Sequence, residues 1–251
     1  SFSLGIRTLD DSVHDAIYAI YGFVRLADEI VDTFHSHDKK ALLDQFTKDT
    51  FQAIEEKISL NPILHSFQWA VNEFQMEHDL IHAFLYSMEL DLTKIDYSEE
   101  EYKKYIYGSA EVVGLMCLRV FCHGNPGEYE ALRSDACALG SAFQKINFLR
   151  DIRSDYEERG RVYFPGIDFN SFTDEEKRAI EADIQLDFDA GLRGIGSLPK
   201  VAQKGCLLAY EYYIRLFEKI KILPASRIKE ARIRVPDWEK MLIYFRLALR
   251  K

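Results

Sequence analysis

Apolar residues recur along this chain at alternating intervals of three and four positions. In the first long segment they form one stripe through about six helical turns, made of Val13, Ile17, Ile20, Val24, Ala27, Val31 and Phe34. This spacing puts the stripe on one face of a helix and predicts an amphipathic α-helix. The same period recurs in residues 39–58, 62–75, 79–92, 99–122, 128–158, 174–195, 200–222 and 237–249. Because no alternating strand pattern competes with it, the sequence predicts an all-α fold.

Capping and turn signals mark the expected ends of these helices. Three pairs have the spacing of a capping box, in which a hydroxyl and an acid three residues later bind free backbone amides; they are Ser12/Asp15, Ser98/Glu101 and Thr173/Glu176. Turns that contain Gly or Pro interrupt the pattern at residues 61–62, 123–127, 159–166, 198–199 and 223–224. No repeat, low-complexity tract or linker divides the chain. We therefore predict a single helical domain over residues 1–251.

The composition is that of a globular protein, and the charge narrows the classes of function. With 251 residues, 47% hydrophobic and 29% charged, the chain can bury a large core. The net charge of -9 argues against nucleic-acid binding, because affinity for a phosphate backbone depends on a basic surface. Residues 225–251, however, contain eight Lys or Arg against three Asp or Glu. We interpret this segment as a solvated helix face, with peripheral contact to an anionic membrane surface as the alternative.

Cysteine usage and hydropathy indicate the compartment. The four cysteines form neither a CxxC pair nor a disulfide-dense pattern, which favours reduced thiols and a cytoplasmic location. No apolar run reaches the roughly 18 residues of a membrane span, and the best candidate, VVGLMCLRVFC, is interrupted by Arg119. The sequence starts at Ser1 without an initiator Met or a signal peptide, so we expect further residues upstream.

Two of the predicted helices carry a polar stripe beside the apolar one. In the first helix it lies one position after the apolar stripe, about 100° around the helix, and consists of Tyr21, Arg25, Asp28 and Asp32. In residues 139–158 a similar stripe consists of Gly140, Gln144, Asn147, Asp151 and Asp155. Each stripe ends in two aspartates one helical turn apart, at the edge of a face that we expect to be buried.

Two aspartates at this spacing repel each other, so we expect a cation beside them. Like charges four residues apart destabilise a helix by roughly 0.2–0.5 kcal/mol, and desolvation near a core edge adds to that cost. Carboxylates one turn apart can share Mg²⁺, which keeps several waters and takes further ligands from a substrate phosphate. Arg25, Arg150 and Arg161 could then hold the remaining phosphate oxygens. We therefore predict that the two aspartate pairs face each other across one cavity.

Other motifs are interpreted as ordinary helix features. Two further acidic pairs share the four-residue spacing, and we interpret both as helical surface without a function: Glu73/Glu77 and Asp183/Asp187. HDLIH, at residues 78–82, is near the zinc-protease pattern, but it has Asp in place of the general base Glu, so we predict a surface or packed histidine pair. GLRGIG, at residues 191–196, follows a helical pattern instead of a strand, so we predict a helix end and turn there.

Two segments resemble the signature regions of a known family. YAIYGFVRLADEIVD and FQKINFLRDIRSDYEERGRVYFP are similar to the two aspartate-rich motifs of the squalene/phytoene synthase family, whose members condense prenyl diphosphates head to head. SFSLG at the start, YIYGSAEVVG in the middle and RIRVPDW near the end support the resemblance, which covers most of the chain. It implies an isoprenoid-synthase-type helical bundle around a central cavity.

The resemblance implies roles for individual residues. The expected ligands of diphosphate-bound Mg²⁺ are Asp28, Glu29, Asp32, Asp151 and Asp155. The expected diphosphate contacts are Arg25, Arg150 and Arg161, and the expected cavity residues near the reacting carbons are Tyr21, Tyr107, Gln144 and Asn147. Substrate contacts are also expected in the matching stretches, at Ser1, Phe2 and Tyr163. The second motif departs from the family at Ser154, where an acid is common, so one metal ligand is expected to be missing or replaced by water.

By the same resemblance the chain is expected to be a prenyltransferase that uses Mg²⁺, or Mn²⁺ in its place. The first choice of reaction joins two geranylgeranyl diphosphates through a cyclopropyl diphosphate to phytoene, in carotenoid biosynthesis. That reaction ends by losing a proton, so no NADPH is expected. Squalene or dehydrosqualene synthesis from farnesyl diphosphate is the alternative. A non-catalytic assembly or scaffold relative is the alternative of another class.

Overall fold

The computed structural model describes residues 5–93, 96–230 and 232–249, which form helices and connecting loops without a β-strand. This confirms the all-α prediction. In chain order the elements are α2 (Asp11–Asp32), α3 (Lys39–Glu56), α4 (Pro62–Glu73), α5 (His78–Thr93), α6 (Glu99–Ile106), the π-helix η1 (Tyr107–Glu111), α7 (Val112–Phe121), α8 (Pro126–Arg159), α9 (Asp174–Ser197), α10 (Lys200–Lys221), α11 (Ala225–Ile228) and α12 (Asp237–Leu249).

The long helices begin and end close to the predicted positions, and two details of α2 are corrected first. The capping boxes at residues 98–101 and 173–176 are present. The one predicted at Ser12 is wrong, because the side chain of Asp10 caps α2 and accepts a hydrogen bond from the Ser12 amide at 3.0 Å. An aspartate two residues earlier binds the free amides as well as a serine does. Phe34, expected as the last member of the apolar stripe, lies beyond the end of α2 and is exposed.

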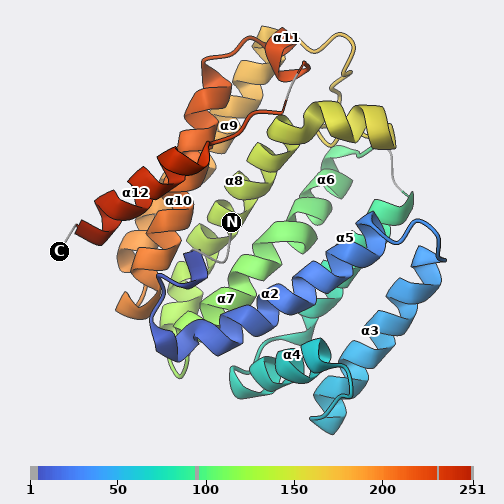
Figure 1. Ribbon diagram of the computed structural model, residues 1–251, viewed down its shortest axis with the longest axis vertical. Coiled ribbons are helices and arrows are strands. Elements are labelled where there is room, and N and C mark those ends of the chain that lie inside the picture. Colours follow the sequence, from blue (N-terminus) through green and yellow to red (C-terminus); the bar gives the residue numbers. More distant parts are fainter. Residues whose placement is uncertain (1–4, 94–95, 231, 250–251) are drawn as a thin grey trace.

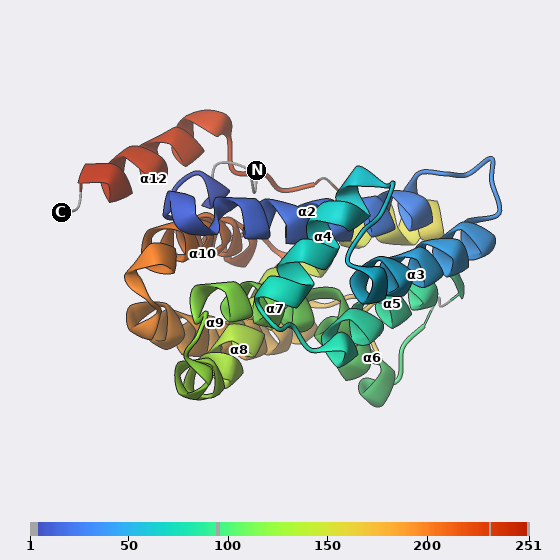
Figure 2. The ribbon, with the colours of Figure 1, turned by 90° about the horizontal axis from the view of Figure 1, so that it is seen from below.

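The longest helix, α8, runs through the middle of the molecule (Figure 1). Its 34 residues make it about 50 Å long. α9 packs along one side of α8, while η1 and α7 pack on another. α2 packs on α3, α4, α5 and α7 and lies on the opposite side of the molecule from α9 (Figure 2). α7 therefore contacts both helices that carry a polar stripe.

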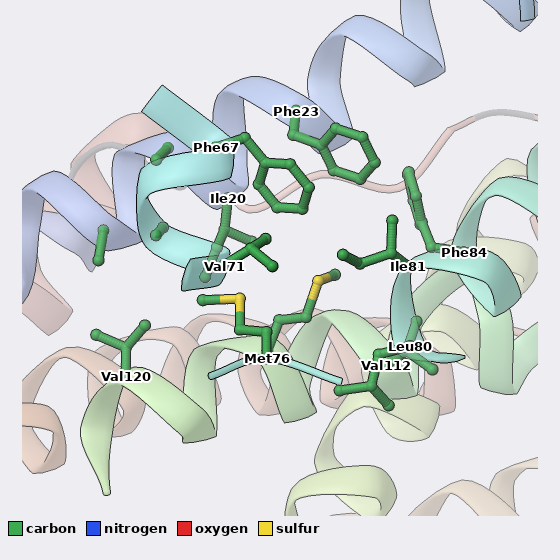
Figure 3. Packing of buried hydrophobic residues seen from close by; sticks show 14 of the residues in the cluster. Ile20, Phe23, Phe67, Val71, Met76, Leu80, Ile81, Phe84, Val112 and Val120 are labelled. Atoms are coloured by element: carbon green, nitrogen blue, oxygen red, sulfur yellow. The ribbon is translucent and has the colours of Figure 1, made fainter. Parts of the chain in front are cut away.

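Two clusters of buried apolar side chains hold these helices together. The first joins α2 to α3, α4, α5 and α7; within it Phe23 stacks on Phe67, with ring centroids 3.8 Å apart (Figure 3). The second joins α6 and the later part of α8 to α9 and α10, and includes the fully buried Phe188. Burying one Phe side chain stabilises a fold by roughly 1.5–3 kcal/mol. α2 and the acidic end of α8 are thus anchored in different clusters.

The helix predicted at residues 99–122 contains a π-turn, η1, between α6 and α7. Glycines let η1 approach its neighbours closely. A Cβ atom at Gly108 would overlap the backbone carbonyl oxygen of Ala83 in α5. One at Gly140 would come within 2.9 Å of the carbonyl oxygen of Ala110. π-turns are frequent at functional sites, and η1 contacts Gly140, a member of the second polar stripe.

Two motifs outside the polar stripes have structural roles. The helix end and turn predicted at residues 191–196 is wrong, because α9 continues to Ser197. Gly191 and Gly194 stay helical and let α9 approach α8 closely, since a Cβ atom at either would overlap a side chain of α8. The histidines of residues 78–82 form the predicted surface pair: both are exposed, and their rings lie 6.0 and 4.2 Å from the ring of Phe51. Within the described residues, no helix has the length and hydrophobicity that crossing a membrane requires.

Candidate functional site

The ends of α2 and α8 that carry the aspartate pairs lie at the same end of the molecule in both ribbon views (Figures 1 and 2). α2 ends at Asp32, and α8 ends four residues after Asp155. The polar stripes therefore lead toward one region from two helices that are anchored in different apolar clusters. That the carboxylates face each other across one central cavity stays a prediction.

The acids of α2 lie beside an arginine of their own helix. Arg25 Nη1 donates a hydrogen bond to Asp28 Oδ2 at 2.7 Å, and its Nη2 pairs with Glu29 Oε1. A hydrogen bond from the Thr33 side chain, followed by the charge of Arg25, lowers the pKa of Glu29. Asp32 is half-buried one turn further along. Because the Arg25 side chain is 53% exposed, this cation can move away from the acids at little cost.

Asp151 of α8 is held by two arginines. Arg150 Nε donates to Asp151 Oδ1 at 2.9 Å, and Arg232 Nε lies 2.7 Å from the same oxygen. Burial, the largest single cause, lowers the pKa of Arg150, but the hydrogen bonds to Asp151 and the charge of that carboxylate, with smaller contributions from Tyr213 and Asp155, together outweigh it and raise the pKa. The Asp151 side chain is only 19% exposed, so the two guanidinium groups replace much of its lost hydration. In this arrangement Asp151 is surrounded by positive charge.

Arg232 is a site residue that the sequence analysis missed. It belongs to the RIRVPDW stretch, which supported the family resemblance without indicating a contact to either aspartate pair. A surface cavity of about 320 Å³ adjoins it and is lined by Arg150, Arg153, Ser154, Glu157, Glu158 and Arg232. Three guanidinium groups at one small cavity can bind the oxygens of an anion such as a phosphate. Ser154 lines this cavity, and its Oγ donates to the Asp151 carbonyl oxygen at 3.0 Å.

The donor set fits a metal that arrives with its ligand. Within the described ranges, no three His, Cys, Asp or Glu side chains lie close enough together to hold a metal ion by themselves. Carboxylate oxygens are nevertheless the ligands that Mg²⁺ prefers, and Mg²⁺ usually completes its shell with waters and substrate phosphates. The acids of α2 and α8 therefore fit a metal bound together with a diphosphate. The ligand roles predicted for the five acids stay predictions.

One to two turns before Asp151 on α8, polar side chains contact an aromatic residue of α10. Asn147 Nδ2 lies 3.4 Å from Gln144 Oε1, and Tyr213 OH donates to Asn147 Oδ1 at 3.3 Å. The ring of Tyr213 stacks on Phe143, with centroids 4.0 Å apart. The sequence analysis missed Tyr213 because it lies in no motif and is one of 14 tyrosines. The pair of Gln144 and Asn147 is brought together as the stripe predicted.

The remaining predicted residues lie in several places. Tyr107, half-buried in η1, interacts with Arg133, which precedes Asp151 by about 27 Å along α8. Its side chain therefore lies away from Asp151, and its predicted place near the reacting carbons stays a prediction. Tyr21 is 37% exposed on α2. The predicted contacts at Ser1 and Phe2 lie outside the described residues.

Arg161 and Tyr163 lie in a buried cluster of their own. Arg161 Nη1 donates to Asp91 Oδ1 at 2.7 Å and to Tyr163 OH at 2.8 Å. Tyr105 OH donates to both oxygens of the same carboxylate, at 2.8 and 2.9 Å. Burial, followed by the charge of Asp91, raises the pKa of Tyr105, so the phenol stays a donor. Asp91 and Tyr105 were missed by the sequence analysis, although Tyr105 lies in the YIYGSAEVVG stretch.

Three of the four acids that were interpreted as surface without a function bind cations of other helices, which corrects that interpretation for them, whereas Glu73 is exposed on α4 as predicted. Asp183 and Asp187 both accept hydrogen bonds from Lys145 Nζ, at 2.5 and 2.7 Å. Glu77 pairs with Arg119, whose guanidinium lies over the ring of Tyr129. These cations come from neighbouring helices and are distant in sequence, so the spacing of the acids did not reveal them.

Comparison with known proteins places this chain in a family. A sequence model described as squalene/phytoene synthase matches residues 1–239. The 4,4'-diapophytoene synthase of Staphylococcus haemolyticus (strain JCSC1435) is 29% identical over 189 residues, which cover 73% of this chain and 64% of that protein. Phytoene synthase 2, chloroplastic, of Oryza sativa subsp. japonica is 27% identical over 240 residues, which cover 88% of this chain and 60% of that protein.

The same comparison extends to the fold. A crystal structure of a dehydrosqualene synthase in complex with ligand has a TM-score of 0.81 at 19% identity, and covers 99% of this chain and 90% of that chain. The match with the two curated relatives spans less than two thirds of their length. From the family match over residues 1–239, the chain belongs to the squalene/phytoene synthase family.

Proposed function

We propose that this chain condenses two prenyl diphosphates head to head, with Mg²⁺ as the metal and Mn²⁺ as a substitute. Geranylgeranyl diphosphate is the proposed substrate and phytoene the product, in carotenoid biosynthesis. The observation that carries the proposal is that the acidic ends of α2 and α8 lie at the same end of the helical bundle, each with at least one arginine on its acids. Such a set of charges suits a ligand that is itself a metal diphosphate.

The arginines would exchange partners when substrate binds. Arg25, Arg150 and Arg232 each bind a carboxylate in the structure, and each can turn to phosphate oxygens once the acids bind metal. Mg²⁺, when bound, neutralises charge on the leaving diphosphate. The guanidinium groups bind the same leaving group, so the carbon–oxygen bond breaks with both electrons on diphosphate and leaves an allylic cation. The stacked rings of Phe143 and Tyr213, beside Gln144 and Asn147, would offer such a cation aromatic faces that do not act as nucleophiles.

The double bond of the second substrate then attacks this cation. Loss of a proton gives a cyclopropyl diphosphate, which ionises in turn, rearranges and loses a second proton to form phytoene. No reductant enters this balance, so no NADPH is expected. The names of the two curated relatives, a diapophytoene and a phytoene synthase, support a product that needs no hydride. Squalene or dehydrosqualene synthesis from farnesyl diphosphate is the alternative, and the fold similarity to a dehydrosqualene synthase supports it.

The decisive experiment incubates the protein with geranylgeranyl or farnesyl diphosphate and Mg²⁺, with NADPH withheld. We expect pyrophosphate release from geranylgeranyl diphosphate that stops when the metal is chelated, and phytoene in the hydrocarbon fraction. Turnover confined to farnesyl diphosphate would select the alternative substrate. A cyclopropyl diphosphate that clears only when NADPH is added would select squalene synthesis. Release from neither substrate would favour the non-catalytic scaffold.

We also propose that the protein acts in the cytoplasm and contacts anionic membrane surfaces through α12. One face of α12 exposes large apolar side chains, namely Trp238, Met241, Leu242 and Phe245. Arg232, Arg234, Lys240 and Arg246 lie in or just before the same helix. Exposed apolar side chains beside basic residues suit an anionic lipid surface, and a forty-carbon product would leave into lipid. No contact with nucleic acid is proposed.

Vesicle sedimentation tests this contact. The unaltered protein should bind vesicles that contain anionic lipid better than neutral ones, and Phe245→Glu should release it. Leu60→Glu, which changes an even more exposed apolar side chain between α3 and α4, is the control and should bind normally. Equal binding by the two variants would contradict the proposal.

A further inference from the structure

The end of α8 is closed by a specific backbone motif beside the second aspartate pair. Gly160 has a left-handed conformation, with φ of 63°, and its amide donates to the carbonyl oxygen of Tyr156. The amide of Arg161 donates to the carbonyl oxygen of Asp155 at 3.0 Å. The bond from Gly160 is that of an αL C-cap, and the two bonds together bind carbonyls in the last turns of the helix, which would otherwise be free. The backbone of Arg161 thus supports the turn that carries Asp155.

The side chain of Arg161 is attached to a different helix. Its Nη1 donates to Asp91 Oδ1 and its Nη2 to the Asp91 carbonyl oxygen, each at 2.7 Å. Two bonds from one guanidinium to one residue set the direction of the side chain as well as its position. Both side chains are nearly inaccessible, with 7% of Arg161 and 10% of Asp91 exposed. Tyr105 of α6 binds the same carboxylate, so Asp91 joins α5, α6 and the segment after α8.

The aromatic surroundings make this attachment rigid. The ring of Tyr163 stacks on Phe148, with centroids 4.0 Å apart, and on Tyr105 at 5.2 Å. Tyr97 stacks on Tyr163 from another side, at 5.6 Å. Stacked rings hold a preferred geometry beyond their burial. The segment that follows α8 is therefore held by a buried ion pair and by rings on both sides of it.

We propose that Asp91 is a positioning residue for the second aspartate pair. It holds the side chain of Arg161, and the backbone of Arg161 holds the turn that presents Asp155 to the metal diphosphate. In this role Arg161 links Asp91 to the end of α8, whereas the resemblance to the family implied that Arg161 contacts diphosphate directly. The inference rests on the proposed function, because it assigns Asp91 to the same site.

The position of Arg161 differs from that of the arginines we assign to diphosphate. Arg25 and Arg232 have side chains that are 53% and 50% exposed, and Arg150 is 22% exposed beside a surface cavity. An exposed guanidinium can exchange a carboxylate for a phosphate because water screens both states. Arg161 could do so only by giving up its two hydrogen bonds to Asp91 and the one to Tyr163. Separating the partners of a buried ion pair is strongly unfavourable.

The two roles of Arg161 predict opposite results for one substitution. Asp91→Asn keeps an acceptor for Tyr105 but removes the negative charge that binds the guanidinium. If Arg161 were a direct diphosphate contact, this change would free it and tighten diphosphate binding. If Asp91 positions the end of α8, the same change loosens the turn at Asp155 and weakens binding. Whether Asp91→Asn tightens or weakens diphosphate binding therefore distinguishes the two roles of Arg161.

The test measures binding of inorganic pyrophosphate with Mg²⁺ by calorimetry, for the whole chain without prenyl substrate. We expect Asp91→Asn and Arg161→Gln each to weaken binding about tenfold, and the double variant to be little worse than either single one, because both remove the same attachment. Asp96→Asn, the same change at an exposed aspartate nearby, is the matched control and should bind normally. Tighter or unchanged binding by Asp91→Asn would overturn the inference.

A second measurement keeps the inference testable if the first variant folds poorly or if pyrophosphate does not bind at all. Amide hydrogen exchange should be faster in residues 152–165 of Arg161→Lys, which keeps a buried cation but cannot make both bonds to Asp91. Exchange elsewhere should stay unchanged. Exchange in Arg161→Lys that rises equally along the whole chain, or that does not rise in residues 152–165, would overturn the positioning role of Asp91. Failure of the unaltered protein to bind Mg²⁺ with pyrophosphate would instead overturn the proposed function.

Discussion

Two aspartate pairs in this molecule share the same four-residue spacing: Asp28/Asp32 on α2 and Asp183/Asp187 on α9. The pair on α2 lies beside Arg25, a cation of its own helix whose side chain is 53% exposed. The pair on α9 binds Lys145, which comes from α8 and has a side chain that is 9% exposed. The acids are chemically the same, so the difference lies in the cation and in its access to water.

This difference separates a binding site from a structural contact. A surface ion pair contributes about 0–1 kcal/mol, so Arg25 can give up its acids to a ligand with little loss of stability. Removing one partner of a buried pair costs about 3–5 kcal/mol, because the other charge is left uncompensated. Lys145 is therefore suited to holding α9 against α8, while the acids of α2 are suited to exchange. Four experiments can break or sharpen this comparison.

The largest expected effect is the loss of activity in Asp28→Asn. Removing a charge that acts on the leaving group should lower pyrophosphate release on the order of 10³-fold. The melting temperature at low Mg²⁺ should hold or rise, because repulsion between neighbouring acids is relieved. Asp183→Asn is the matched control and should keep its activity. Equal losses in both variants, or unfolding of Asp28→Asn, would remove the distinction between the pairs.

The second effect is a loss of stability in Lys145→Met. The side chain keeps its size but leaves two aspartates without their shared cation. Because the Asp183 side chain is 59% exposed and screened by water, the free energy of unfolding should fall by about 2 kcal/mol, less than for a fully buried pair. Urea denaturation measures this, and activity at low temperature should remain. Adding Asp183→Asn and Asp187→Asn to the same variant should recover most of the stability. No loss in the single variant would show that the buried cation contributes little.

The third effect concerns Glu111, a further carboxylate close to this lysine. The pKa of Glu111 is raised to about 7 in total. Burial is the largest cause; the hydrogen bond with Cys137 lowers the pKa, the charge of Asp187 raises it and the charge of Lys145 lowers it. A carboxyl with a raised pKa binds its proton more tightly in the folded state, so stability falls as pH rises from about 4.5 to about 7 and is level above that. The loss amounts to at most about 3 kcal/mol.

Urea denaturation between pH 4.5 and pH 8 measures this dependence. Glu111→Gln should lack the loss of stability over that range, because the amide does not ionise. Glu130→Gln, at an exposed position on α8, is the control and should keep the dependence of the unaltered protein. A dependence that survives in Glu111→Gln would assign it to another group.

The smallest effect is expected at Ser154. Its side chain lines the cavity beside Asp151, so a carboxylate there adds charge and an oxygen near the metal. In Ser154→Glu, the Mg²⁺ concentration for half-maximal activity should fall about two- to fivefold. This corresponds to a gain in metal-binding free energy of less than about 1.4 kcal/mol, which would be tenfold. Ser134→Glu places the same charge at an exposed position on α8 and should leave the titration unchanged. An unchanged titration in both would show that residue 154 faces away from the metal.

Much of the fold and part of the site follow from local pattern. The helical period is repeated within each segment, so the helices were predicted to within a few residues, and η1 was the only break inside one of them among the described residues. The aspartate pairs, Gln144 and Asn147 were found because they follow that period too. Arg232 and Tyr213 were not, because their contacts with Asp151 and Asn147 join residues 81 and 66 positions apart.

The sequence by itself determined the all-α architecture, the two polar stripes and the family. These properties depend on spacing along one helix or on a run of adjacent residues, and both can be read from the chain. Only the tertiary structure decided which acids bind a buried lysine, which bind exposed arginines, and that Arg161 binds Asp91. The reason is physical: a charged side chain takes its role from the cation, the rings and the water around it. Packing between helices sets those surroundings.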